Sequence, residues 1–181
     1  MNIHCKEFVE YISTMASKNN KQVVEDAVCD RYSLTKDRKV FQNEYFAARF
    51  CYSKSSSDSF SNTVLSLSAL EKYDKIPFFV VLVRQSADNL ILLANTTFLK
   101  KISHSSKNLS VNNIRGSFNG SDIMRSYDGK TNAPENFDFL FALHQGLDWE
   151  DNLLRLVDAS SHIKPVSQKF VPTDDERNNI F

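Results

Sequence analysis

Glycine, proline and cysteine are scarce in this chain, whose 181 residues include four Gly, four Pro and three Cys. With so few Gly and Pro, we expect mostly regular helices and strands joined by polar loops. The cysteines, Cys5, Cys29 and Cys51, are odd in number, far apart and without CxxC spacing. This pattern disfavours a disulfide framework and a zinc site, and it predicts free thiols in a reducing compartment. We therefore expect a cytoplasmic protein.

Long apolar runs and a net charge are also missing from the sequence. No apolar run approaches the ~20 residues of a membrane-spanning helix, and the first residues lack the basic-then-apolar order of a signal peptide. No membrane partner is therefore expected. The 22 Lys and Arg balance the 22 Asp and Glu. This balance gives no support for a protein that binds nucleic acid non-specifically through an overall positive charge. The length and the 41% apolar content predict one globular domain, which we place at residues 1–163, before a polar linker or tail at residues 164–181.

Helices are predicted at both ends of the chain. Apolar side chains at helical spacing and suitable capping residues predict helices over residues 3–17 and 20–32. Pro134, followed by acidic residues, marks the start of a helix over residues 135–146, and a further amphipathic helix is expected over residues 148–160.

Strands are predicted in the middle of the chain. The aromatic-rich segment 44–53 predicts a strand that places Arg49 on its more open face. Residues 76–84 are nearly all apolar, which is typical of a central strand that is buried on both faces. Residues 90–99 predict the next strand, and the short turn between the two makes them antiparallel neighbours.

The segment 63–74 carries two conflicting patterns. Its V-L-S-L-S alternation suits a strand, whereas A-L-E-K-Y suits a helix, and Pro77 favours a helix that ends before it. The predicted fold is therefore α/β or α+β, with a small mixed sheet that contains the antiparallel pair 76–84/90–99 and helices at both ends of the chain.

Motifs that would identify an enzyme are absent from the sequence. The four histidines have no HxxxH or HxH spacing, so isolated surface or capping positions are expected rather than metal ligands; they are His4, His104, His144 and His162. There is no phosphate-binding GxxxxGK[ST] loop, no GxGxxG and no GxSxG. A metal-dependent nuclease centre needs grouped carboxylates, often as acid-x-Lys on a strand, and the predicted strands contain none. We therefore predict no catalytic residue, no metal ligand and no cofactor within this chain.

One segment stands out because it has no acidic residue. Residues 89–121 contain four Lys or Arg, no Asp or Glu, and many Ser and Asn. Such side chains donate hydrogen bonds to phosphate oxygens and to base edges, and the absence of carboxylates removes repulsion of a phosphate backbone. A solvated polar loop would have a similar composition. If the segment binds DNA, the predicted contacts are Lys100, Lys101, His104, Ser105, Ser106, Lys107, Asn113, Arg115 and Asn119, flanked by Arg49 and Lys54.

The overall pattern of residues 40–163 resembles the amino-terminal, DNA-recognition region of prokaryotic type II restriction-endonuclease-like proteins. The resemblance rests on IPFFVVLVR at 76–84, ILLANTTFLKK at 91–101, IRGSFNGSDIM at 114–124 and WEDNLLRLVDAS at 149–160. It implies double-stranded DNA as the partner and a role in defence against foreign DNA. It also implies that the cleavage carboxylates and their Mg²⁺ belong to a nuclease domain outside these residues.

Two other functions remain open from the sequence. In the first, the acidic helices at 135–160 contact a partner subunit, and the chain is a protein-interaction or regulatory module; a homodimer is one form of this. In the second, the chain is a small enzyme in which His104 acts with Ser105 or Ser106. Neighbours in sequence seldom form a nucleophile–base pair, because the base needs an orienting group from elsewhere in the fold.

Overall fold

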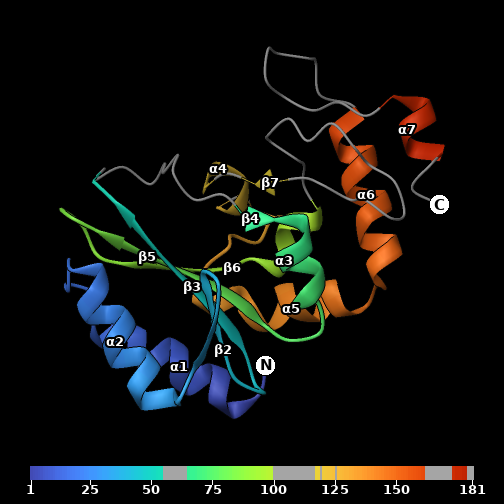
Figure 1. Cartoon of the computed structure of the whole chain (residues 1–181). Helices are drawn as coiled ribbons and strands as arrows, with labels where there is room; N and C mark the ends of the chain where they lie inside the picture. Colours follow the sequence, from blue (N-terminus) through green and yellow to red (C-terminus); the bar gives the residue numbers. More distant parts are fainter. Residues whose placement is uncertain (55–64, 100–116, 119, 125, 162–172, 179–181) are drawn as a thin grey trace.

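A five-stranded mixed sheet organises the chain. The computed structural model describes residues 1–54, 65–99, 117–118, 120–124, 126–161 and 173–178. The strand order is β1-β2-β3-β5-β6, in which β3 and β5 are parallel and all other neighbours are antiparallel (Figure 1). The strands are β1 (Thr35–Asp37), β2 (Val40–Gln42), β3 (Ala47–Ser53), β5 (Phe78–Arg84) and β6 (Leu90–Leu93). A separate two-stranded ladder joins β4 (Leu65–Ser66) to β7 (Ser117–Phe118).

Helices cover both faces of this sheet. They are α1 (Ile3–Thr14), α2 (Lys21–Tyr32), α3 (Leu67–Lys72), α4 (Gly120–Ile123), α5 (Phe137–Gln145), α6 (Trp149–Ser161) and α7 (Asp174–Asn178), with short 3₁₀ helices η1 (Asn95–Leu99) and η2 (Pro134–Asn136). In Figure 1, α1 and α2 lie below the sheet, and α3 and α4 lie on the other side. This confirms the predicted α/β class, the mixed sheet and the helices at both ends of the chain.

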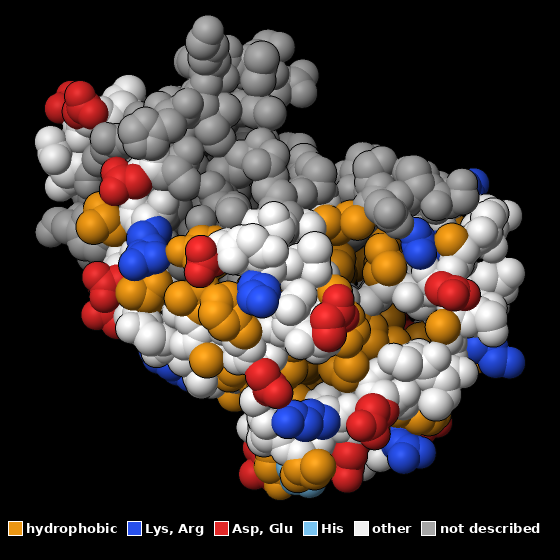
Figure 2. Space-filling model, turned by 180° about the vertical axis from the view of Figure 1, so that it is seen from behind, with side chains coloured by type: hydrophobic (Ala, Val, Ile, Leu, Met, Phe, Trp, Pro, Cys, Tyr) orange, Lys and Arg blue, Asp and Glu red, His pale blue; other side chains and the backbone are white. Residues whose placement is uncertain are grey.

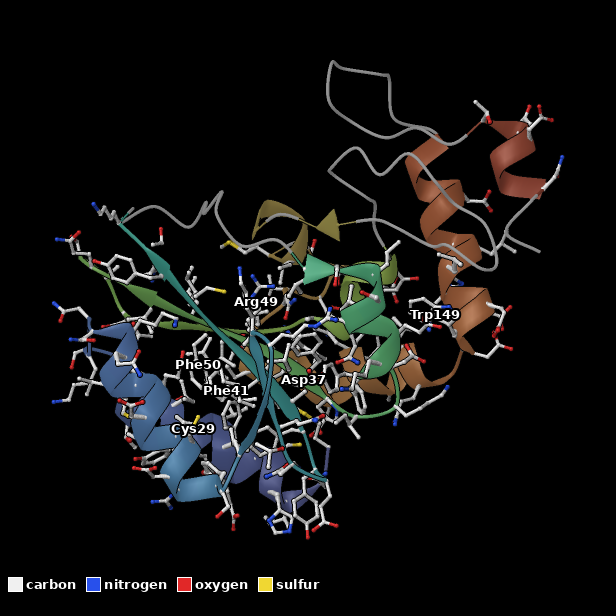
Figure 3. The ribbon with its side chains drawn as sticks, in the orientation of Figure 1. Cys29, Asp37, Phe41, Arg49, Phe50 and Trp149 are labelled. Carbon is white, nitrogen blue, oxygen red and sulfur yellow. The ribbon has the colours of Figure 1, made fainter. Side chains whose placement is uncertain are left out.

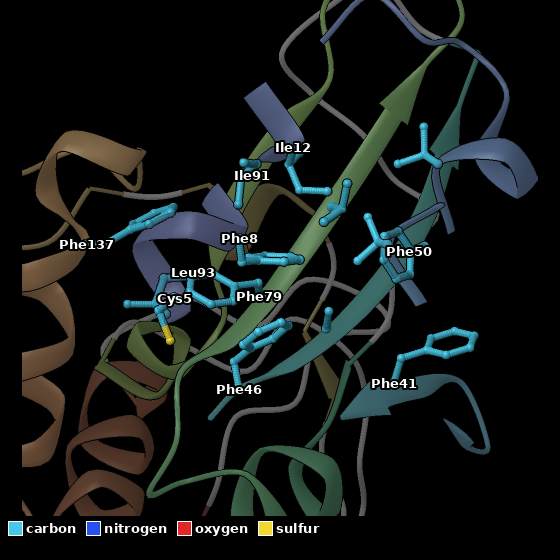
Figure 4. Close-up of a cluster of buried hydrophobic side chains, with 14 of the residues drawn as sticks. Cys5, Phe8, Ile12, Phe41, Phe46, Phe50, Phe79, Ile91, Leu93 and Phe137 are labelled. Atoms are coloured by element: carbon cyan, nitrogen blue, oxygen red, sulfur yellow. The ribbon is translucent and has the colours of Figure 1, made fainter. Parts of the chain in front are cut away.

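The central strand β5 is buried along its whole length, as its continuous apolar run predicted. Alternate β5 side chains enter two separate cores. On the face towards α1, α2 and α5, Phe79 packs against Phe8 and Phe137, with ring centroids 5.0 and 5.7 Å away (Figure 4). On the other face, Phe78 packs among side chains of α3, α4 and α6. Burying an aromatic side chain of this size stabilises the fold by about 2–3 kcal/mol.

The predicted strand 90–99 is wrong in its second half, because β6 ends at Leu93 and η1 follows. Asn95 causes the change. Its Oδ1 accepts a hydrogen bond from Phe78 N at 2.7 Å, and its Nδ2 donates to the carbonyl oxygens of Tyr73 and Ile76. The fully buried side-chain amide thereby pairs with three backbone groups, which holds the chain in this turn. The antiparallel pairing of β5 with β6 is confirmed.

A β-hairpin lies between α2 and β3, in a segment for which the sequence predicted no helix or strand. Strand β1 pairs with β2, and Asp37 opposite Val40 leaves a two-residue turn at Arg38 and Lys39. Arg38 adopts the left-handed conformation with φ 56°, which a tight hairpin turn requires. The hairpin has little apolar periodicity because β1 is an exposed edge strand, so the sequence pattern did not reveal it.

The ambiguous segment 63–74 contains both predicted elements. Within its described part, β4 is followed directly by α3, and Ser66 caps this helix by accepting a hydrogen bond from Ala69 N. Of residues 164–181, only 173–178 belong to the described chain, and they contain α7. The prediction of a linker or tail is otherwise outside the described residues.

Several large apolar side chains reach the surface. Among the described residues they are Ile3, Val23, Tyr52, Phe139 and Leu154. The face seen in Figure 2 is hollowed, and hydrophobic side chains gather around the hollow. None of the described helices has the length and apolarity needed to cross a bilayer.

Candidate functional site

A basic pocket lies where the β1–β2 hairpin meets β3 and the start of α2. Its volume is about 340 Å³. The lining comprises Lys21 and Glu25 of α2, Lys36, Arg38, Lys39 and Phe41 of the hairpin, and Arg49, Phe50, Cys51 and Tyr52 of β3. We call this cavity the basic edge pocket.

Positive charge dominates the basic edge pocket. Its described lining contains five Lys or Arg against one carboxylate, that of Glu25. Lys21 neutralises this carboxylate, since its Nζ lies 2.7 Å from Glu25 Oε2. The lining contains four further cations, and a cluster of cations in a concave surface favours a positive potential, because low-dielectric walls focus the field.

The sequence brings three of these cations together through one turn. Lys36 lies on β1, and Arg38 and Lys39 form the two-residue turn of the hairpin. Asp37, between them, points to α3, where it accepts hydrogen bonds from Lys72 Nζ and from Tyr73 Oη at 3.3 Å. The hydrogen bond from Lys72 lowers the pKa of Asp37. Asp37 therefore pairs with Lys72 and Tyr73 and does not line the pocket.

Within the described residues, the edge of β3 beside this pocket is only partly paired. Strand β2 pairs with β3 only at Ala47 and Ala48. Ala47 N donates to Pro77 O, and Gln85 N donates to Ser53 O, so the odd-numbered residues of β3 face β5 with their backbone groups. The N–H and C=O groups of Phe50 and Tyr52 therefore point away from β5, towards the edge of β3 along which β2 no longer pairs.

The side chain of Arg49 projects from the face of β3 opposite to that of Phe50. Figure 3 places Arg49 on one side of the sheet and Phe41 and Phe50 on the other, towards α2. The sequence predicted that the Arg49 face would be the more open one. This is wrong for its neighbours, because Ala47 and Cys51 are buried in the core against α3, and Arg49 itself is half-buried.

Two of the predicted DNA contacts lie in the described chain. Arg49 lines the basic edge pocket, and Lys54 is exposed directly after β3 but is outside the lining. The remaining predicted contacts lie outside the described residues; they are Lys100, Lys101, His104, Ser105, Ser106, Lys107, Asn113, Arg115 and Asn119. The pocket cations that the prediction missed are Lys21, Lys36, Arg38 and Lys39. The charge run K-D-R-K at 36–39 is the signal in the sequence that could have indicated them.

A buried polar cluster lies away from this pocket, at the end of α5. His144 and Asp74 are only 1% and 4% exposed, and His144 Nε2 lies 2.7 Å from Asp74 Oδ1 and 3.2 Å from Asp74 O. Asn152 Nδ2 donates to His144 O at 3.5 Å. The prediction of an isolated surface or capping histidine is therefore wrong for His144, because the fold brings Asp74 from a distant turn to its ring.

Metal ligands do not gather in the described part of the chain, where no group of three or more His, Cys, Asp or Glu side chains could hold an ion. The histidines that belong to this part do not lie together. His4 stacks on Tyr45, with ring centroids 3.9 Å apart, whereas His144 lies in the cluster of α5.

The thiols of Cys5 and Cys29 should react slowly in the folded chain. Burial raises the pKa of Cys5 to about 12, and burial followed by the nearby carboxylate of Glu25 raises the pKa of Cys29 to about 11. Since the thiolate is the nucleophile, we expect alkylation by iodoacetamide at pH 8 to be at least about a hundredfold slower than in the urea-unfolded chain. Peptide mass spectrometry of a labelling time course measures this; equal rates in both states would contradict it.

Comparison with known proteins identified no relative. No protein-family model, no curated protein and no solved structure matches this chain.

Proposed function

We propose that this chain is a recognition domain for double-stranded DNA and that the basic edge pocket contributes to its binding surface. The observation that carries the proposal is the charge of this pocket, five cations around one neutralised carboxylate in a chain with no net charge. Arg49, which the sequence selected as a DNA contact, lies among them.

The chemistry of the pocket suits a phosphate backbone. Lys and Arg side chains supply the salt-dependent part of DNA binding, because they displace condensed counterions. Arg38 and Arg49 can also make bidentate contacts with phosphate or guanine. The exposed ring of Tyr52 borders the pocket and offers an apolar surface beside the cations.

We further propose that the domain serves a restriction endonuclease or a related defence nuclease whose cleavage centre lies outside this chain. This part of the proposal rests on the sequence resemblance, together with the absence of an acid-x-Lys pattern from the strands that the sequence predicted. Mg²⁺ would then be needed by the nuclease domain and not for binding by this chain.

Salt dependence of duplex binding tests the proposal. We expect fluorescence anisotropy with a labelled 30-base-pair duplex to give an affinity that falls steeply with salt. If three or four pocket cations contact phosphates, log K against log[salt] should have a slope of about −3 or steeper. The affinity should be the same with EDTA as with Mg²⁺. No binding at low salt, or a slope near zero, would refute the proposal.

A further inference from the structure

A second cavity lies at the opposite edge of the sheet, along β6. Its volume is about 500 Å³. The lining is Ile12, Ser13, Ala16, Asp88, Asn89, Leu90, Ile91, Leu92, Met124, Thr131, Asn132, Ala133 and Pro134. This size and this mixture of apolar walls with a few polar groups are typical of sites for small molecules.

The outer edge of β6 presents backbone hydrogen-bonding groups to this cavity. Leu90 and Leu92 pair with β5, and Ala94 N donates to Phe78 O, so Ile91 and Leu93 turn their N–H and C=O groups outward. Ile91 as a whole residue is only 6% exposed. A backbone group in such a place is normally paired.

The two neighbouring outward-facing positions of this edge, Asn89 and Leu93, already have hydrogen-bond partners. Asn89 N donates to Ala16 O at 2.8 Å, which closes the edge at one end. At the other end, the carboxamide of Asn132 accepts from Leu93 N and donates to Leu93 O, both at 2.8 Å. Within the described chain, no side chain or loop makes the corresponding bonds to Ile91. Among the described residues, the N–H and C=O of Ile91 are therefore an unpaired donor and acceptor at the cavity, between the paired backbone groups of Asn89 and Leu93.

Asn132 shows which chemistry fits this edge. Its single carboxamide spans the N–H and the C=O of one residue, because a primary amide carries its donor and its acceptor on the same side. A trans peptide unit points its N–H and C=O in opposite directions and cannot do so. An added peptide strand would also meet Asn132 and Ala16 at once, so the open length is too short for strand addition.

We propose that this cavity binds a small ligand with a primary carboxamide or a cis-lactam on an apolar body. The amide pairs with the N–H and C=O of Ile91, and the apolar body packs against Ile12, Met124 and Pro134. Asp88 is the one charged side chain of the described lining. Anionic ligands are therefore disfavoured. This site is independent of the basic edge pocket and of DNA binding.

Fragment titrations followed by NMR test this inference. Benzamide, added to the ¹⁵N-labelled chain, should shift the amide signal of Ile91 saturably, with a dissociation constant of about 1 mM, as expected for a ligand of this size. N-methylbenzamide keeps the ring and the carbonyl but holds its N–H on the opposite side, and it should bind at least about tenfold more weakly. Hydrogen exchange at Ile91 should slow with benzamide only.

Matched variants locate the binding. Ser13 is exposed and lines the cavity, whereas its exposed neighbour Thr14 does not. Ser13→Trp should fill the cavity mouth and abolish the benzamide shift, and Thr14→Trp should leave it unchanged. The inference is overturned if benzamide does not shift Ile91 at about ten times the expected dissociation constant, if both amides bind equally, or if Thr14→Trp has the same effect as Ser13→Trp. Preferential binding of an extended peptide would instead indicate strand addition and would also overturn it.

Discussion

The double substitution Arg38→Glu/Lys39→Glu should weaken duplex DNA binding about a hundredfold at low salt. Each lost cation removes a phosphate contact, and each new carboxylate adds repulsion, which together amount to about 3 kcal/mol. Both residues occupy the turn of the β1–β2 hairpin, where their side chains are exposed and make no part of the core. The fold should therefore survive, and anisotropy titrations of the variant and the unchanged chain measure the difference.

A charge-matched control separates the pocket from the net charge. Lys18 and Lys130 are exposed cations outside the basic edge pocket. Lys18→Glu/Lys130→Glu changes the net charge by the same amount as the hairpin variant, and it should lower the affinity less than about threefold, since exposed charges beyond ~10 Å are screened. Equal losses in the two variants would show that binding depends on overall charge and would exclude a specific role of this pocket.

Removal of the His144 side chain should produce the other large effect, a loss of about 3–5 kcal/mol in the free energy of unfolding. His144→Ala leaves a cavity beside α5 and deprives the buried carboxylate of Asp74 of its closest partner. Asp74→Ala should destabilise the fold by a similar amount, because it removes the buried carboxylate whose Oδ1 lies 2.7 Å from His144 Nε2 and leaves a small cavity in its place. Urea denaturation followed by circular dichroism measures both.

The pair should also be strongly coupled. In a double-mutant cycle, the variant with both substitutions should be at least about 1 kcal/mol more stable than the sum of the single effects predicts. Lys75 is the matched control, because its exposed Nζ lies 3.4 Å from the other oxygen of Asp74. Lys75→Ala should change the stability by less than about 1 kcal/mol. Additive losses in the cycle would mean that His144 and Asp74 act independently.

The regular elements with strong local signals were predictable from the sequence. The apolar stripe around Phe8 and the N-cap Asn20 located α1 and α2, and the unbroken apolar run of residues 76–84 located the central strand. These predictions succeeded because period and capping are local properties of the chain. Strand β6 was predicted too long because its end depends on contacts with other parts of the chain. The three partners of Asn95 come from Tyr73, Ile76 and Phe78, and no local pattern contains them.

The candidate site was only partly visible in the sequence. Arg49 was identified as a cation on a strand, but its partners in the pocket come from α2 and from a hairpin that was not predicted. Lys21 is separated from Arg49 by 28 positions along the chain, and only the packing of α2 beneath β3 brings them to one cavity. The charge run at 36–39 is visible in the sequence. Its contribution to the pocket depends on a hairpin in which Asp37 pairs with Lys72 while Lys36, Arg38 and Lys39 line the pocket.

By itself, the sequence determined the class of fold, the antiparallel pair at its centre and the positions of most helices, because apolar periodicity and capping act between near neighbours. Only the tertiary structure decided which polar groups meet. It joined His144 to Asp74, placed five cations around one carboxylate and, among the described residues, gave Asn89 and Leu93 hydrogen-bond partners at the outer edge of β6 but none to Ile91 between them. Each of these arrangements links residues from different elements, and their distance in space is set by how the layers pack on the sheet.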